Sequence, residues 1–268
     1  MKKISLAIPT YFSSKYLSIL LRSIKNSKFI DEVVISDDSK SNIEKSKIEK
    51  ILYKFAKDNK GIDFRFVQNK KNLGAFNNKF NVIDLCSNDI VYQIDSDNIA
   101  AKNIDYMLSE VLNNFDNKNI YYPSTLKQFF YNYQYYVSPN RNLVKLTTEN
   151  LKVNSKIISD SIKNDKSITL EKNIYWILNC GNFITSKDEY LDTMRKYYNN
   201  KEIPLAADAL AISYLWLHSG KEIFLSKNHY HFHRKRDDSV SLSNLKESEK
   251  SFSFFREKFN SLWLFCSD

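Results

Sequence analysis

Two aspartates separated by one residue, Asp95-Ser96-Asp97, directly follow the apolar run Ile90–Ile94. Such a run is typical of a buried strand. Two carboxylates on the turn after it offer hard oxygen ligands to Mg²⁺ or Mn²⁺. Mg²⁺ usually takes one or two protein carboxylates and completes its shell with substrate phosphates and water. The pattern therefore predicts a divalent-cation site at Asp95 and Asp97.

Three of the four histidines, His229, His231 and His233, alternate within five residues. Alternation on an extended segment places the three side chains on one face. Imidazole binds divalent cations, and Arg234 and Arg236 follow with charge suited to a diphosphate. We expect a role in metal or diphosphate binding, with His231 and His233 as the leading candidates for a metal ligand; the structural alternatives are an exposed cationic strand and a nucleic-acid patch.

The elements that must position these groups follow a regular pattern over the first hundred residues. Apolar runs at 4–10, 33–35, 64–67 and 90–94 predict four strands, and apolar residues at helical spacing predict three helices between them. This alternation favours an α/β fold, with a mostly parallel central sheet flanked by helices. Right-handed crossovers then bring the carboxyl ends of the strands to one edge, where open α/β sheets bind ligands. Three polar segments lie at those ends: Pro9-Thr10-Tyr11, Ser36-Asp37-Asp38 and Asp95-Ser96-Asp97.

The second half of the chain is less regular. We expect strands at Tyr175–Leu178, Glu222–Leu225 and Tyr230–His233, and helices at 103–114, around Leu205–Trp216 and in the C-terminal tail. The polar segment 140–172 is expected to be the most mobile. The aromatic stretch Phe129–Tyr136 favours a core or oligomer contact over stacking on an acceptor.

Composition excludes several classes of protein. The chain has 268 residues, 43% hydrophobic and 26% charged, which argues against disorder, and no apolar run approaches the ~18 residues of a membrane span. Its net charge of +9 suits an anionic partner, although the lysines are scattered. The three cysteines show no metal-site spacing. We expect a cytoplasmic protein and leave open a peripheral contact with the cytoplasmic membrane face.

Glycine is scarce, with 4 residues where an average composition gives roughly 19. The chain has neither a Gly-x-Gly-x-x-Gly after the first strand nor a Gly-x-x-x-x-Gly-Lys-Ser/Thr loop. The usual dinucleotide and P-loop phosphate sites are therefore excluded. A metal held by carboxylates is the expected means of neutralising phosphate charge.

Four segments together resemble the family 2 glycosyltransferases of bacterial polysaccharide and glycoprotein type, which have the A-type (GT-A) nucleotide-sugar fold. These segments are Ile4–Tyr11, Val33–Ser39, Asn72-Leu73-Gly74 with Lys79, and Ile90–Asp97. The resemblance covers residues 3–100 well and 174–240 more loosely. Two motifs depart from it: Asp37-Asp38-Ser39-Lys40 replaces the usual Asp-Asp-Gly-Ser, and Asn78-Lys79-Phe80 replaces the usual Ala-Arg-Asn.

The resemblance implies one GT-A-like domain over residues 1–268. It would consist of a nucleotide-binding half (1–100), an acceptor and donor-sugar half (101–240) and a tail helix (241–268). The nucleotide would contact Pro9, Thr10, Tyr11, Asp37, Asp38, Lys79, Asp95 and Ser96. Within that set, the Tyr11 ring would lie against the base, Asp38 would accept the uracil imide N–H, and Lys79 would stand in for the usual arginine near the base.

Further roles come from the same resemblance. Asn179, Gly181 and Asn182 would line the donor sugar. Asp97 would bind the metal directly, and Asp95 would contact the ribose and the water molecules on the metal. Arg234 and Arg236 would hold the departing diphosphate. Asp208 would be the general base, although Ala207 replaces the glutamate that usually precedes it.

The implied reaction is inverting transfer of a sugar from a nucleoside diphosphate, expected to be UDP, to a hydroxyl of a saccharide or lipid-linked acceptor, with Mn²⁺ or Mg²⁺. A nucleotidyltransferase that makes nucleotide sugars is one alternative, but it needs a glycine-rich, arginine-containing loop after the first strand. A non-enzymatic basic protein that binds nucleic acid or anionic lipid is another. It explains the net charge but not the acidic strand ends, and we expect no nucleic-acid partner.

Overall fold

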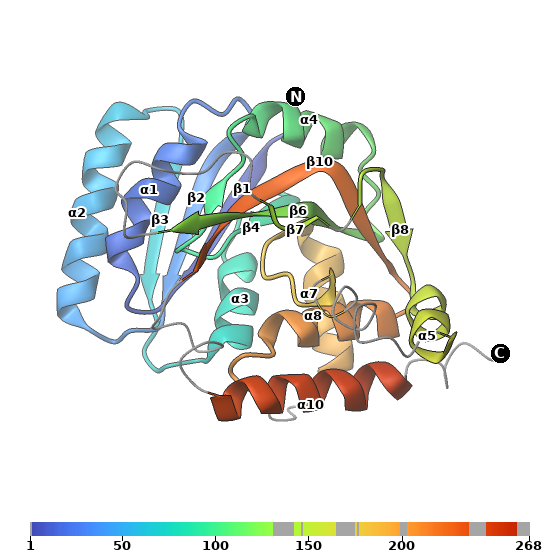
Figure 1. Ribbon diagram of the computed structural model, residues 1–268. Coiled ribbons are helices and arrows are strands. Elements are labelled where there is room, and N and C mark those ends of the chain that lie inside the picture. Colours follow the sequence, from blue (N-terminus) through green and yellow to red (C-terminus); the bar gives the residue numbers. More distant parts are fainter. Residues whose placement is uncertain are drawn as a thin grey trace.

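The computed structural model describes residues 2–130, 142–145, 147–164, 175, 177–198, 203–235 and 245–261. Its strands form one sheet in the order β3-β2-β1-β4-β9-β6-β10-β5, with β7 paired to β6 and β8 paired to β10. Helices cover both faces of this sheet (Figure 1). The predicted α/β class, a central sheet flanked by helices, is confirmed.

The first half alternates strands and helices as predicted. Its elements are β1 (Ile4–Thr10), α1 (Ser14–Ile24), β2 (Ile30–Asp37), α2 (Asn42–Asp58), β3 (Asp63–Gln68), α3 (Ala75–Asp84) and β4 (Ile90–Gln93). Strand β1 pairs in parallel with β2 and β4, and β2 pairs in parallel with β3. The carboxyl ends of these strands therefore meet at one edge.

The second half completes the sheet with both parallel and antiparallel pairs. Its elements are β5 (Ile99–Ala100), α4 (Ile104–Asn113), β6 (Asn119–Phe130), β7 (Asn142–Lys145), β8 (Leu151–Val153), α5 (Ser155–Asn164), β9 (Phe183–Ser186), α7 (Lys187–Tyr197), α8 (Asp208–His218), β10 (Glu222–Lys235) and α10 (Leu245–Ser261). Strand β9 joins the halves, because it pairs antiparallel with both β4 and β6. Strand β10 pairs in parallel with β6.

Two expectations for the second half are wrong. The segment expected as a strand at Tyr175–Leu178 is helical where it is described, and Asn179 N donates to Tyr175 O at 2.8 Å, as in a helical turn. A short apolar run has no period that separates a strand from a buried helical turn. The two short strands expected at Glu222–Leu225 and Tyr230–His233 are one strand, β10, with an irregular register between Ser226 and Tyr230.

The other expectations for this half can be compared with the structure only where it describes the chain. Helices α4, α8 and α10 match the predicted ones. Part of the polar segment 140–172 forms β7, β8 and α5. Most of the aromatic stretch Phe129–Tyr136 lies outside the described residues, as do Arg236 and Cys266.

Two apolar cores stabilise the layers. One core joins the sheet to α1, α2 and α4, and the other joins it to α3, α7, α8 and α10. Figure 1 shows α1 and α2 grouped at one side of the molecule and α3, α7, α8 and α10 grouped together away from them. Successive residues of β1 face opposite cores, with Leu6 and Ile8 in one and Ala7 in the other. Among the described helices, none is long and apolar enough to cross a bilayer.

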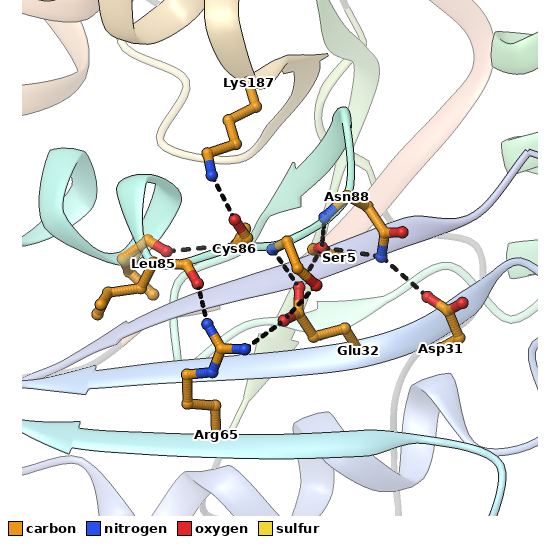
Figure 2. A network of polar contacts seen from close by, with 10 residues as sticks. Ser5, Asp31, Glu32, Arg65, Leu85, Cys86, Asn88 and Lys187 are labelled. Carbon is orange, nitrogen blue, oxygen red and sulfur yellow. Dashed lines mark hydrogen bonds and ion pairs between the residues drawn. The ribbon is translucent and has the colours of Figure 1, made fainter.

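A buried polar network fixes the amino ends of β1, β2 and β4 (Figure 2). Glu32 accepts hydrogen bonds from the Ser5 hydroxyl and from the backbone and hydroxyl of Ser87, the latter two at 2.8 Å. Asn88 donates to Ser5 Oγ through its backbone N–H and its side-chain amide. The network therefore sets the register of three strands at the edge opposite their polar carboxyl ends.

Candidate active site

A buried lysine joins two aspartates at the carboxyl edge of the sheet. Lys79 Nζ, on α3, lies 3.0 Å from Asp95 Oδ1, directly after β4, and 2.7 Å from Asp208 Oδ2, the first residue of α8. The lysine side chain is 6% exposed, whereas Asp95 and Asp208 retain 31% and 17% exposure. Three of the predicted site residues therefore form one cluster that opens to solvent through its carboxylates.

Charge decides the protonation of Lys79. Burial alone would lower its pKa, but the carboxylates of Asp208 and Asp95 outweigh burial and raise the pKa above its ordinary value. The ammonium is therefore charged at neutral pH. Lys79 is therefore a buried, paired cation and not a solvated helix lysine.

The loop before β9 closes around Asp95. Asn182 Oδ1 accepts from Asp95 N at 2.8 Å, and Gly181 O accepts from Lys79 Nζ at 3.4 Å. A Cβ on Gly181 would lie 2.5 Å from Asp95 Oδ2 and 2.8 Å from Lys79 Nζ, so glycine alone leaves room for the cluster. Asn179 bonds to the Tyr175 hydroxyl at 3.2 Å. Of the predicted donor-sugar residues, Gly181 and Asn182 therefore support Asp95, and Asn182 is fully buried.

The end of β1 exposes two aromatic rings next to this cluster's edge of the sheet. Tyr11 and Phe12 are 56% and 51% exposed, with ring centroids 4.9 Å apart. Phe12 has φ 48°, a strained conformation for a bulky residue. Both rings are exposed to solvent, which suits stacking on a base. Pro9 and the buried Thr10 precede them as the last two residues of β1.

The aspartates after β2 are engaged within the protein. Asp37, fully buried, accepts from Thr10 Oγ1 at 2.9 Å and from Ser39 Oγ at 2.5 Å. Asp38 accepts from Asn69 Nδ2 at 2.7 Å and from Leu73 N at 3.0 Å. Burial and the charge of Asp37 raise the pKa of Asp38, and hydrogen bonds from Asn69, Leu73 and Gly74 oppose the rise. Asp37 thus shapes the loop, while Asp38, which is also buried, accepts from Asn69 and from the Leu73–Gly74 backbone.

Two asparagines absent from the predicted site organise this edge. Asn78 Nδ2 donates to Thr10 O and Ser36 O, both at 3.2 Å, and Asn78 Oδ1 accepts from Asn69 Nδ2 at 3.1 Å. Asn78 therefore ties α3 to the ends of β1 and β2 and so places Lys79, its neighbour on α3. Its replacement of the usual alanine was the one signal in the sequence.

The turn after β4 is anchored from both sides. Ser96 Oγ lies 2.6 Å from Ser13 Oγ, and Asp97 O accepts from Arg234 Nε at 2.9 Å. Arg234 is 3% exposed, and its guanidinium lies 4.6 Å from the Tyr16 ring centroid. Arg234 therefore holds the backbone of the Asp-x-Asp turn.

The three histidines occupy different environments along β10. His229 is fully buried against Tyr92, and burial lowers its pKa to about 3. His231 is 2% exposed, and its ring lies 6.0 Å from that of His233. Burial also lowers the pKa of His233, against the charges of Asp97 and Asp95, which raise it. Of the three histidines, His233 is therefore the one whose pKa responds to the charges of Asp97 and Asp95.

These residues fit a divalent cation only in part. Among the described residues, no cluster of three or more His, Cys, Asp or Glu side chains is arranged to hold a metal ion. Asp95 is paired with Lys79, whose ammonium competes for the same oxygen. Asp97 and His233 are the protein groups that fit, and the shell would need substrate phosphates and water, as Mg²⁺ sites often do.

The fold and the sequence both have known relatives. Three crystal structures of S. aureus TarS resemble the chain: one in complex with UDP-GlcNAc (TM-score 0.59, 18% identity), one in complex with UDP (0.59, 15%) and one described without a ligand (0.56, 16%). The similarity spans 90%, 96% and 98% of this chain, in the same order, and 61%, 65% and 70% of the TarS chains. No curated protein matches. The family model "Glycosyl transferase family 2" matches residues 5–171, more than half of the chain. With the GT-A-like sheet and its acidic edge in place, that match makes the chain a member of glycosyl transferase family 2.

Proposed function

We propose that this chain transfers a sugar from a UDP-linked donor to an acceptor hydroxyl, with inversion at the sugar carbon and with a divalent cation. One observation carries the proposal. Asp208, from the start of α8, lies against the same lysine as Asp95, from the end of β4. A candidate base and a candidate donor-binding carboxylate are thus brought together from distant parts of the chain.

The donor would bind along the carboxyl edge of the first strands. Tyr11 offers an exposed ring for the base, and the Asp38 carboxylate, an acceptor-only group, would accept the imide N–H of uracil. That S. aureus TarS was crystallised with UDP-GlcNAc and with UDP on the same fold supports a UDP-linked donor. The diphosphate would then lie over the Asp95–Asp97 turn.

Asp208 would carry out the proton transfer. Its carboxylate would take the proton of the acceptor hydroxyl while the hydroxyl oxygen forms a bond to the anomeric carbon. On the opposite face, the bond from that carbon to the diphosphate oxygen breaks, and its electron pair leaves with the diphosphate. A bound cation would supply positive charge to the departing diphosphate, and Asp97 with His233 would hold it.

The remaining residues keep these groups in place. Arg234 fixes the Asp-x-Asp backbone through Asp97 O, and Arg236 is proposed to face the diphosphate. The acceptor is proposed to be a saccharide or a lipid-linked saccharide, which would bring the enzyme to the cytoplasmic membrane face. No nucleic-acid partner is proposed.

A thermal-shift panel tests this function. Purified protein is heated with UDP, other nucleoside diphosphates and UDP-sugars, each with and without Mn²⁺, because a ligand of the native state raises Tm. We expect UDP to raise Tm in Mn²⁺ and to do so far less without it. Binding of DNA that weakens with salt, with no response to any nucleotide, would instead support a basic nucleic-acid-binding protein.

A further inference from the structure

We propose that Lys79 is a positioning residue that holds the base Asp208 and the donor-side Asp95 in a fixed relation, and that it makes no contact with the nucleotide. This proposal rests on the function proposed above. It departs from the role that the family resemblance implies, in which Lys79 replaces an arginine near the base.

The hydrogen-bonding capacity of Lys79 carries the argument. A lysine ammonium has three N–H donors and no acceptor. The three acceptors around Nζ are Asp208 Oδ2 at 2.7 Å, Asp95 Oδ1 at 3.0 Å and Gly181 O at 3.4 Å. Because the protein occupies all three donor positions, none is left for an oxygen of uracil or ribose.

Burial makes this arrangement costly to change. The Lys79 side chain is 6% exposed, so its charge depends on the two carboxylates for compensation. The dependence is mutual, because two aspartates this close repel one another unless a cation lies between them. Removing the ammonium should therefore move the carboxylates apart and take Asp208 out of line with the acceptor.

The surrounding backbone is built to fit the bridge. Gly181 leaves space that a methyl group would take from both Asp95 and Lys79. Asn182 holds the backbone of Asp95 at 2.8 Å, and Asn78 fixes the helix that carries Lys79. Four segments thus converge on one ammonium: α3, the end of β4, the loop before β9 and the start of α8.

The test combines Lys79→Met, Asp208→Asn and the double variant, with turnover at saturating donor and UDP affinity measured on each preparation. We expect Lys79→Met to lower kcat at least roughly a hundredfold, as loss of a base does, while UDP affinity stays within about threefold. The double variant should be no slower than the slower single variant, because residues that act as a unit are strongly non-additive. Lys187→Met is the matched control, a half-buried lysine bonded to Cys86 O at the other edge, and it should leave kcat unchanged.

The outcomes separate this inference from the function on which it rests. A tenfold or larger loss of UDP affinity in Lys79→Met with kcat retained would make Lys79 a nucleotide contact and overturn the proposal. Multiplicative losses in the double variant would overturn it too. Normal turnover of Asp208→Asn would remove the base itself, and the positioning role with it.

A second variant covers the case in which Lys79→Met does not fold. Lys79→Arg keeps the compensating charge, but its planar fork cannot reproduce the three bonds of a compact ammonium. We expect it to fold, to bind UDP as the wild type does, and to turn over about tenfold more slowly because Asp208 is displaced. Wild-type turnover in Lys79→Arg together with altered UDP affinity would overturn the proposal.

Discussion

Two polar clusters lie at opposite ends of the same parallel strands, and they differ in how far their carboxylates are exposed to solvent. At the amino end, Glu32 is 3% exposed and receives hydrogen bonds from Ser5 and Ser87, with Arg65 3.5 Å away (Figure 2). At the carboxyl end, Asp95 and Asp208 share Lys79 but retain 31% and 17% exposure. The first cluster is closed by the protein, and the second is open to a ligand.

The difference also appears in the neighbouring polar atoms. Around Asp95, the amide oxygen Oε1 of Gln93 and the amide nitrogen Nδ2 of Asn182 are buried without a hydrogen-bond partner among the described residues. Around Glu32, the described Ser5, Ser87, Asn88 and Arg65 all make the hydrogen bonds already named or bond to nearby backbone, as Arg65 does to Leu85 O at 2.5 Å. Unsatisfied buried polar groups cost stability, and these two lie beside Asp95 at the edge proposed to bind the donor.

The largest expected effect is at Asp208. Asp208→Asn keeps the shape and removes the ability to accept a proton, so we expect turnover to fall about 10²–10⁴-fold. UDP affinity in Mn²⁺ should stay near the wild-type value, because the residue would face the acceptor. Measuring both on one preparation decides the matter; turnover and UDP affinity lost together would make Asp208 a donor-site or structural residue.

The next effect is at Asp97. Asp97→Asn removes the charge that would hold the cation, so we expect UDP affinity in Mn²⁺ to fall at least about tenfold while the fold stays intact. Asp84→Asn is the matched control, since Asp84 is 47% exposed and paired with Arg195 on the surface. Equal Mn²⁺-dependent UDP affinity in Asp97→Asn and the wild type would contradict the metal assignment.

The closed cluster should respond in stability and not in rate. Glu32→Gln puts an amide group in place of the carboxylate that accepts from Ser5 and Ser87, so we expect a loss of about 1–3 kcal/mol in the free energy of unfolding. Turnover per folded molecule should not change. Urea unfolding and turnover of the same sample check both expectations, and a slowed but fully stable variant would contradict the comparison.

The same carboxylate predicts a pH dependence of stability. Burial would raise the pKa of Glu32, but the hydrogen bonds from Ser5 and Ser87 and the charge of Arg65 outweigh it and lower the pKa. A lowered folded-state pKa gives stability that is present above the unfolded value, about 4.3, and is lost as pH falls through the folded value. Between pH 7 and pH 3 the wild type should therefore lose more stability than Glu32→Gln; parallel curves would contradict this account.

The smallest effect should distinguish two neighbouring histidines. We expect His233→Ala to need about tenfold more Mn²⁺ for half-maximal activity, because the charges of Asp97 and Asp95 act on His233 and raise its pKa against burial. His231→Ala should not shift this requirement, since His231 is 2% exposed. Identical Mn²⁺ titrations for both variants and the wild type would leave the histidines without a role at the metal.

Much of the fold and part of the candidate site could be predicted from neighbouring residues alone. Short apolar runs placed β1 to β4, and apolar residues at helical spacing placed α1 to α3 and the helix that begins at Asp208. That pattern also placed the polar segments at the carboxyl edge, because consecutive βαβ units are right-handed. The strand predicted at 175–178 was wrong, since a short apolar run has no period that separates a strand from a helical turn. The division of β10 into two strands was also wrong, since an irregular register leaves no mark in composition.

Only the tertiary structure decided which polar groups meet. The motif around Lys79 marked it as a site residue but did not identify its partners, which are Asp95 and Asp208 because α3, α8 and the end of β4 pack together. The sequence does not distinguish Asp37 from Asp38, yet in the folded chain Asp37 accepts from Thr10 and Ser39, whereas Asp38 accepts from Asn69 and Leu73. Local pattern determines where a side chain stands on its own element, whereas charge pairing falls off within a few ångströms and so depends on how distant elements pack.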